Sequence, residues 1–325
     1  MSQTMKGYSL LLAAALASAE TLPGDRTISA GSVVNSVTFT ADGKSIAANC
    51  RDGKLRLWDA RTGELQRTMP LEKGVSGVTL ARQSDTFAGV EAGKIKVWNL
   101  KTGETASTLS PVGQPPRRIG LSKDQQLTAV SSATSNTGSE DTIRVYDAAG
   151  KERFAVAAGI GGTSTISFSP DGSVLVASSY DSNVRAFSTR NGELVRFIEE
   201  IPVAMFDAAF SPDGKIFATA GADRIVYLFD AKSGRLQRKL PEQPEMISSL
   251  AFSPNGRLLL TGGFSVVTQM APVKLMLWDL ESAKPIRTLD AAHRVGSVAF
   301  STDGTLAAST SGDDKIHVWG IPASK

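Results

Sequence analysis

The sequence predicts an all-β fold, a seven-bladed β-propeller of four-stranded antiparallel blades in which the amino-terminal strand completes the last blade. Three observations lead to this prediction: an internal repeat of about 41 residues, apolar residues that alternate along short segments, and turn residues between those segments. A lone four-stranded sheet of this length buries too little apolar surface to be stable, whereas blades stacked around an axis bury both faces.

Seven similar units follow one another along the chain. Each begins with an alternating apolar stretch, as in Val37-Thr38-Phe39, and ends with a second alternating stretch that closes on an aromatic residue. Several units carry Asp-Gly or Asn-Gly between the two stretches, which predicts a hairpin because glycine accepts the positive φ that the turn needs. The closing aromatics are spaced by 40, 48, 41, 42, 49 and 41 residues, the length of a propeller blade. They are Trp58, Trp98, Tyr146, Phe187, Phe229, Trp278 and Trp319.

Closure of the ring follows from a count of strands. Only six residues follow Trp319, too few for a turn and an outermost strand. The segment from Asp25 to Ser29 precedes the first unit and has no blade of its own. We therefore expect this segment to complete the seventh blade, which removes an open sheet edge and makes residues 20–325 a single domain.

The turns and strand ends resemble those of the WD-repeat family, in a bacterial-type form, over roughly residues 27 to 321. This resemblance implies a buried network of a histidine, a hydroxyl residue, an aspartate and a tryptophan within a blade. Only the last unit has all four, which are His293, Ser309, Asp313 and Trp319. The equivalent aspartates of other units are expected to accept backbone N–H groups of a tight turn; they are Asp52, Asp181 and Asp223. Because this aspartate recurs with the repeat, we expect a structural role and not a hydrolase triad.

The first nineteen residues have the features of a secretory signal. Lys6 precedes an apolar run over residues 8–17, and Ala17-Ser18-Ala19 provides a cleavage site. The run is shorter than the roughly 20 apolar residues that span a bilayer. We expect cleavage after Ala19 and an extracytoplasmic location, periplasmic or secreted. The alternative is a short helix packed on a cytoplasmic protein.

Composition argues against several classes of function. The formal charge of +3 comes from 35 basic and 32 acidic residues, and no run of five like charges occurs, so neither a nucleic acid nor a membrane surface is an expected partner. Cys50 is the single cysteine, and there are two histidines. Thiolate clusters and multi-histidine metal sites are therefore not expected, and we predict no cofactor, no metal and no catalytic residue.

One face of the ring is predicted to carry the partner site. In a four-strand meander, the loop between the second and third strands and the loop between successive blades point to the same face. Two insertions, at residues 132–140 and 264–272, fall there. The family resemblance implies contacts six and four residues before the last apolar residue of each first strand, and just before the turn aspartate. These positions are Asn35, Arg51, Ser76, Glu91, Arg117, Ser164, Tyr180, Phe206, Met246, Ser248 and Arg294.

The sequence thus predicts a non-enzymatic scaffold, monomeric in isolation, that binds a protein or peptide on this face. Two alternatives stay open. An extracytoplasmic propeller enzyme, such as a lactonase-like hydrolase, needs carboxylates or a metal near the central channel, where Asp207 is the only acid we place. A fixed subunit of a larger assembly is the other.

Overall fold

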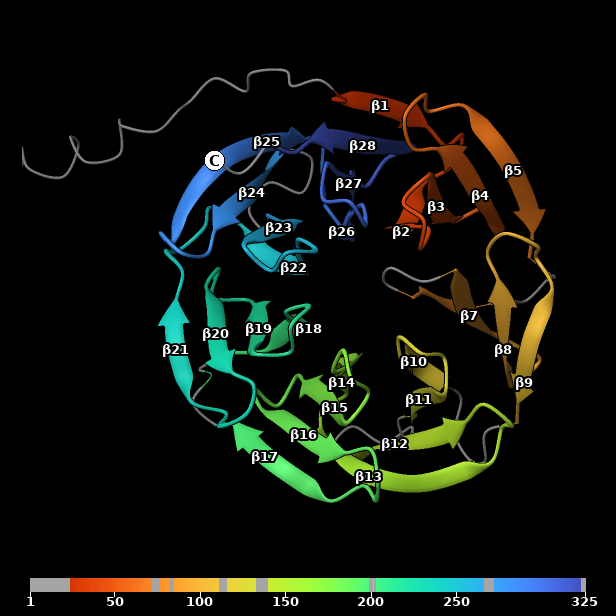
Figure 1. Ribbon diagram of the computed structural model, residues 1–325, viewed down its shortest axis with the longest axis vertical. Coiled ribbons are helices and arrows are strands. Elements are labelled where there is room, and N and C mark those ends of the chain that lie inside the picture. The colour runs from red at the N-terminus through yellow and green to blue at the C-terminus, as the bar shows by residue number, and fades with distance from the viewer. Residues whose placement is uncertain are drawn as a thin grey trace, which may run out of the picture.

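The computed structural model describes residues 24–71, 76–81, 85–110, 116–132, 140–198, 201, 203–265 and 272–322. The predicted signal segment, residues 1–19, lies outside this part. The described residues form seven four-stranded antiparallel sheets arranged around a central axis (Figure 1). This confirms the predicted all-β, seven-bladed propeller. No helix within the described ranges is long and apolar enough to cross a membrane.

The innermost strand of each blade lines the axis, and the second strand lies beside it. The innermost strands are β2 (Val34–Phe39), β6 (Ser76–Leu80), β10 (Pro116–Leu121), β14 (Thr163–Phe168), β18 (Met205–Phe210), β22 (Met246–Phe252) and β26 (Val298–Phe300). The second strands are β3 (Ser45–Cys50), β7 (Thr86–Glu91), β11 (Leu127–Ser132), β15 (Val174–Ser179), β19 (Ile216–Gly221), β23 (Leu258–Phe264) and β27 (Leu306–Thr310).

The third strand of each blade carries the closing aromatic, and the fourth forms the rim. The third strands are β4 (Lys54–Asp59), β8 (Lys94–Asn99), β12 (Glu140–Asp147), β16 (Val184–Ser188), β20 (Val226–Asp230), β24 (Val273–Asp279) and β28 (Lys315–Gly320). The outer strands of blades 1 to 6 are β5 (Leu65–Pro70), β9 (Thr105–Leu109), β13 (Glu152–Ile160), β17 (Leu194–Ile198), β21 (Leu236–Lys239) and β25 (Lys284–Ala291).

The ring closes as predicted. The amino-terminal strand β1 (Arg26–Ser29) pairs antiparallel with β28, with Ile28 opposite Ile316, and the last sheet has the order β1-β28-β27-β26. Figure 1 shows β1 and β28 side by side in this blade. Because the outer strand comes from one end of the chain and the inner three from the other, blade 7 holds the circle together.

A recurring turn connects the first and second strands. In blade 5 the Ser211 hydroxyl donates to the Asp213 carboxylate at 2.6 Å, and the amide of Lys215 donates to the same oxygen at 3.1 Å. Ser211 Oγ also accepts the amide of Ile216 at 2.9 Å. Gly214 has a φ of 71°, the left-handed conformation that glycine adopts most easily. The Ser-Pro-Asp-Gly pattern is thus a self-contained turn that sets the hairpin.

The core lies between neighbouring blades. At one junction, Ala218 and Leu228 of blade 5 pack with Leu250, Leu259 and Trp278 of blade 6. At the closure, Val37 and Phe39 of blade 1 share a cluster with Ile316 and Val318 of blade 7. The inner strands of each sheet are buried against both neighbouring blades in this way.

A ring of arginine bridges reinforces the rim at five blade junctions. In each, an arginine of the outer strand donates to a backbone carbonyl of the following blade at 2.7 to 2.9 Å. The donors and acceptors are Arg26 to Ala60, Arg67 to Thr102, Arg196 to Lys232, Arg238 to Leu280 and Arg287 to Gly320. At the same register, blades 2 and 3 have Ser107 and Phe154, so their outer strands carry no arginine at this position.

The two predicted insertions lie mostly outside the described residues, at 133–139 and 266–271. Their described parts lengthen the strands of blades 3 and 6. Strands β12 and β25 have 8 residues and β13 has 9, whereas most strands have 4 to 6. The extra length extends the sheets toward the predicted partner face.

Candidate functional site

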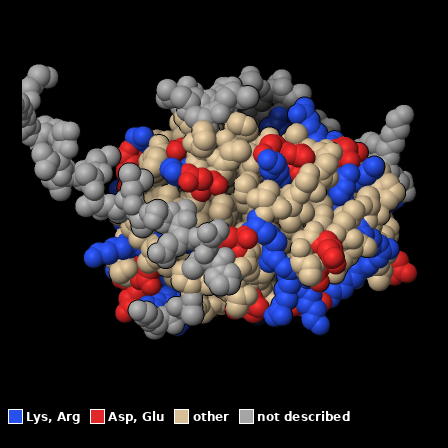
Figure 2. Space-filling model, turned by 90° about the horizontal axis from the view of Figure 1, so that it is seen from above, with Lys and Arg blue, Asp and Glu red and all other residues tan. Residues whose placement is uncertain are grey.

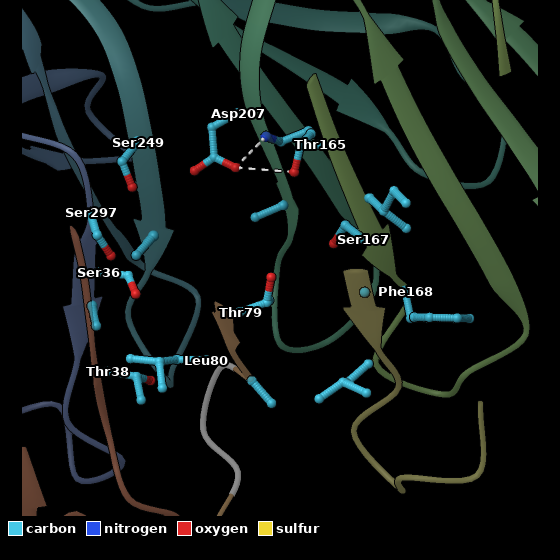
Figure 3. Close-up of a pocket in the computed structure, with 18 of the residues that line it drawn as sticks. Ser36, Thr38, Thr79, Leu80, Thr165, Ser167, Phe168, Asp207, Ser249 and Ser297 are labelled. Carbon is cyan, nitrogen blue, oxygen red and sulfur yellow. Dashed lines mark hydrogen bonds between the residues drawn. The ribbon is translucent and has the colours of Figure 1, made fainter. Parts of the chain in front are cut away.

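The ring has two surfaces that could serve a function, the central cavity and the face with the long loops. The cavity has a volume of about 480 Å³ and is lined by the innermost strands of all seven blades. Small polar side chains project into it, as Figure 3 shows for Ser36, Thr79, Thr165, Ser167 and Ser297. Asp207 also lines this cavity, where the sequence placed it.

Three of the polar residues in the cavity tie adjacent blades together. Asp207 Oδ2 accepts the amide of Leu250 at 3.0 Å, and its Oδ1 accepts the amide of Ala208 at 2.8 Å. Ser249 Oγ accepts the amide of Val298 at 3.1 Å. Ser297 Oγ both accepts the amide of Val37 and donates to its carbonyl. Both oxygens of the Asp207 carboxylate are thus occupied by backbone donors, as expected of a structural acid.

The described part of the chain contains no group of three or more His, Cys, Asp or Glu side chains that could hold a metal ion. Asp207 is 7% exposed, and its role between blades 5 and 6 does not require a substrate. The cavity therefore offers small polar groups and hydrogen-bonded backbone, and the face above it offers the larger side chains.

Six innermost strands share an irregularity that the sequence did not predict, and in all of them but β6 a single skipped residue can be identified. In those five, the pairing with the second strand slips by one residue near the partner face. A bulge of this kind redirects side chains, and the residue after it lines the cavity in each of these five strands. The skipped residues, Asn35, Arg117, Ser164, Phe206 and Ser248, are all among the predicted contacts.

The predicted contacts differ in accessibility. Five are exposed: Asn35, Arg51, Arg117, Tyr180 and Arg294. Three are half-buried: Phe206, Met246 and Ser248. Two are buried: Glu91 and Ser164. The side chain of Ser76 lies outside the described part.

Three of the less accessible residues have internal roles. Glu91 forms an ion pair with Lys96 of the adjacent strand. The carbonyl of Ser164 accepts Arg118 Nε at 2.8 Å. Ser248 Oγ donates to the carbonyl of Val295 at 2.5 Å and so joins blades 6 and 7. In this conformation the side chains of Glu91 and Ser248 make internal contacts, and Ser164 does so through its backbone carbonyl.

Side chains from four blades form a continuous row on this face, which we call the aromatic row: Tyr180, Phe206, Phe264 and Arg294. The ring of Tyr180 lies 6.3 Å from that of Phe206, which lies 5.9 Å from that of Phe264. The Arg294 guanidinium lies 4.9 Å from the centre of the Phe264 ring. Phe264 is the member that our contact positions missed. It begins the insertion of the sixth unit, and that apolar loop was the only sequence signal for it.

The acids of the same loops are matched within their own blades. Asp52 pairs with Arg56 at 2.5 Å, and this hydrogen bond lowers the pKa of the Asp52 carboxyl. Asp181 pairs with Arg185 at 2.9 Å. Its burial would raise the pKa, but the hydrogen bonds from Arg185 and Asn183 outweigh burial and lower it. Both carboxylates stay ionised and are neutralised locally.

The turn role predicted for the recurring aspartates is confirmed. The amide two residues on donates to the carboxylate of Asp52 at 3.2 Å, Asp181 at 3.1 Å, Asp223 at 3.3 Å and Asp313 at 2.9 Å. These aspartate turns fix the start of the third strand in their blades. In blade 5 the Tyr227 hydroxyl also donates to Asp223 at 2.7 Å, and burial, followed by this bond, raises the pKa of Tyr227.

The four residues of the implied network in blade 7 are only partly joined. Trp319 Nε1 donates to Ser309 Oγ at 3.0 Å. Asp313 instead accepts the Ser311 hydroxyl at 2.7 Å. His293 Nδ1 is buried without a hydrogen-bond partner among the described residues. The expected continuous chain from histidine to tryptophan is therefore not formed.

Blade 6 has a closer version of this network, built on a glutamine. Trp278 Nε1 lies 3.3 Å from Thr261 Oγ1, and Thr261 donates to Gln243 Oε1 at 2.7 Å. Gln243 is 5% exposed and lies in the loop between blades, as His293 does. We missed it because we searched that position for histidine, although an amide oxygen can accept the same hydrogen bond.

The seven four-stranded blades around one axis define a β-propeller built from sequence repeats. The WD40 family, described as WD domain, G-beta repeat, matches residues 20–59, 159–188, 202–230, 234–265 and 283–320, which is more than half of the chain. The protein belongs to the WD40-repeat family. No curated protein gives a significant match.

Proposed function

We propose that the protein is a non-enzymatic scaffold that binds a protein or peptide on the face formed by the loops between second and third strands and between blades. WD40 propellers are commonly interaction scaffolds. The observation that carries the proposal is the aromatic row, which brings predicted contacts of blades 4, 5 and 7 together with Phe264 of blade 6. Aromatic residues and arginine are the types that dominate binding energy at interfaces.

The opposite face differs in kind. It carries tight turns such as the one at Asp213, in which the polar side chains form hydrogen bonds within the turn itself. On the face with the long loops, ring contacts join Tyr180, Phe206 and Phe264. A rigid disc with one elaborated face supports a docking role more directly than a chemical one.

Site-specific photocrosslinking tests this proposal. A photoreactive amino acid is placed at exposed positions of the proposed face, Arg51, Tyr180 and Arg294, and at exposed turn positions of the opposite face, Arg61, Arg190 and Lys215. We expect the first set to give one shared adduct in the native source and the second set to give none. Adducts that form equally from both faces, or only from the turn positions, would exclude the proposed surface.

We further propose that residues 1–19 are removed on export and that residues 20–325 act outside the cytoplasm as one domain. The support is the sequence pattern described above. Expression with the native amino terminus in a bacterium, followed by fractionation and amino-terminal sequencing, should give a periplasmic chain that starts at Glu20. A chain that keeps Met1 in the cytoplasm would contradict export without affecting the proposed docking face.

A further inference from the structure

The aromatic row ends in a cation on each side. Arg294 stacks on Phe264 at one end. At the other end, Gly162 has a φ of 108°, and a Cβ added there would lie 3.5 Å from Arg117 Nη1 and 3.6 Å from Tyr180 Cδ2. Arg117 and Tyr180 therefore approach the same glycine, so Arg117 of blade 3 lies beside the Tyr180 end of the row, while Arg294 of blade 7 is its other end.

These end cations are not neutralised by their surroundings. Arg117 and Arg294 are exposed, as is Arg51 of blade 1, and within the described ranges none of the three has an ion pair or a side-chain hydrogen bond. The loop acids that could oppose them are engaged elsewhere, since Asp52 binds Arg56 and Asp181 binds Arg185. One buried acid, Asp141, lies near Arg117 at Gly162; its carboxylate accepts the amide of Thr163 at 2.5 Å and forms no ion pair with Arg117 among the described residues.

The centre of the row is an apolar surface that remains accessible. Tyr180 is 44% exposed. Phe206 and Phe264 are half-buried, and Phe206 also lines the mouth of the central cavity. Aromatic pairs prefer tilted or offset contacts, so a further ring can pack against Tyr180 and Phe206 without disturbing the row.

We propose that the aromatic row binds an extended acidic peptide segment of a partner protein, with an aromatic side chain at its centre and carboxylates that reach Arg117 and Arg294. This inference rests on the proposed docking function and specifies its ligand. Laid end to end, the contacts from Tyr180 to Arg294 span at most about 17 Å, a length that about five extended residues cover at roughly 3.3 Å each. Arginine binds carboxylates in a planar, two-pronged geometry, which suits the ends of such a segment.

A nucleic-acid strand is the other ligand that rings and arginines can hold, but the charge distribution favours the peptide. Nucleic-acid binding needs a basic stripe that follows many phosphates. Here basic and acidic side chains are interspersed, as Figure 2 shows for the edge of the ring, and they are nearly equal in number at 35 and 32. Three separate arginines do not make such a stripe.

Fluorescence anisotropy with defined probes tests the inference. The main probe is a labelled heptapeptide with a central phenylalanine, two aspartates on each side and a glycine at each end. Matched probes replace the aspartates by lysines or the phenylalanine by alanine, and a labelled oligothymidine serves as the nucleic acid. We expect binding of the main probe that weakens with salt, at least tenfold weaker binding of the alanine probe and no binding of the lysine probe.

Variants then locate the binding. Arg117→Glu and Arg294→Glu should each weaken the main probe by about tenfold or more, because each loses a charge-assisted hydrogen bond. Tyr180→Ala, at an exposed ring, should weaken it without affecting the fold. Arg61→Glu, an exposed arginine of the opposite face, is the matched control and should leave binding unchanged.

The outcomes separate this inference from the proposed function. Tighter binding of the lysine probe or of oligothymidine, or equal losses in Arg117→Glu and Arg61→Glu, would overturn the acidic peptide as ligand. If the main probe does not bind, the acidic peptide is likewise excluded as the ligand. If photocrosslinks from Arg51 and Arg294 still form under those results, the docking face stands and only its ligand class is wrong.

Discussion

Asp25 and Arg287 form a two-pronged ion pair that joins the start of the chain to blade 6, with Asp25 Oδ2 2.5 Å and Oδ1 3.3 Å from the guanidinium. Both side chains are 9% exposed. Asp25 Oδ1 also accepts the amide of Gly320 at 2.7 Å, and Arg287 donates to the carbonyl of the same residue. One carboxylate thus connects the amino terminus, the last strand and the preceding blade.

We expect Arg287→Ala to lower the free energy of unfolding by about 3–5 kcal/mol, since removal of one partner leaves a buried charge unpaired. Urea unfolding measures this loss. The matched control is Lys215→Ala, which removes the exposed pair with Asp213 and should cost less than about 1 kcal/mol. Equal effects of the two substitutions would show that the closure does not depend on this pair.

The closing tryptophans should differ in their contribution to stability. Trp278 is 1% exposed, so Trp278→Ala should cost about 3–5 kcal/mol through lost burial and a cavity. Trp319 is only partly buried, so Trp319→Ala should cost less. Thermal and urea unfolding of both variants show which substitution costs more stability. Trp278→Phe keeps an aromatic ring in the core and should cost less than Trp278→Ala. A greater loss at Trp319 would contradict the packing described for blade 6.

The arginine bridges predict that one substitution lowers the free energy of unfolding and that another raises it. Arg238→Met keeps most of the side-chain stem but loses the bonds to the carbonyls of Leu280 and Glu281, so unfolding should become easier by about 1–3 kcal/mol. Ser107→Arg places an arginine at the register where blade 2 lacks one. It should stabilise the protein by about 0.5–1.5 kcal/mol.

Thr108→Arg is the control for the gain, because successive side chains of a strand point to opposite sides. It should leave the unfolding free energy nearly unchanged. If Ser107→Arg and Thr108→Arg have the same effect on the unfolding free energy, the gain comes from net charge or from the strand propensity of arginine. It does not then come from a bridge to blade 3.

Acid should weaken the turn at Asp42 in a defined pH range. The hydroxyl of Thr40 donates to this carboxylate at 2.7 Å, and with Lys101 it lowers the pKa of Asp42 from 3.8 to about 2. The lowered pKa means that the stabilisation is complete above about pH 4 and is lost as the pH falls toward 2. Carboxyl NMR titration should show the pKa of Asp42 rising in Thr40→Val. An unchanged pKa in that variant would exclude the hydroxyl as the cause.

The fold could be predicted from the sequence because its signals are local and repeated. The spacing of Trp58, Trp98 and their equivalents gave the number of blades, and the missing outer strand after Trp319 located the closure at residues 25–29. Each of these signals depends on strand periodicity and turn chemistry, which act within a few residues.

The candidate site was only partly predictable, because it depends on contacts between blades. The bulge at Phe206 has no distinct sequence signature, so the sequence could not show which neighbouring side chain enters the cavity. The contact between Phe264 and Arg294 joins residues 30 positions apart in different blades. Burial of Ser164 and the pairing of Glu91 with Lys96 also arise from packing that periodicity does not encode.

The arginine bridges have a direction. In each of these bridges the donor lies in one blade and the acceptor in the next, so the blades are joined head to tail. The donor of blade 7 is Arg26, which reaches Ala60 of the first blade. It does so because the amino-terminal strand β1 pairs with β28, the last strand of the chain. A head-to-tail interface that does not close within one molecule can continue between molecules. A chain shortened to remove residues 24–29 would therefore expose the edge of β28. Strand β1 of an intact neighbouring molecule can pair with that edge, and the strand that closes the ring then links one molecule to the next.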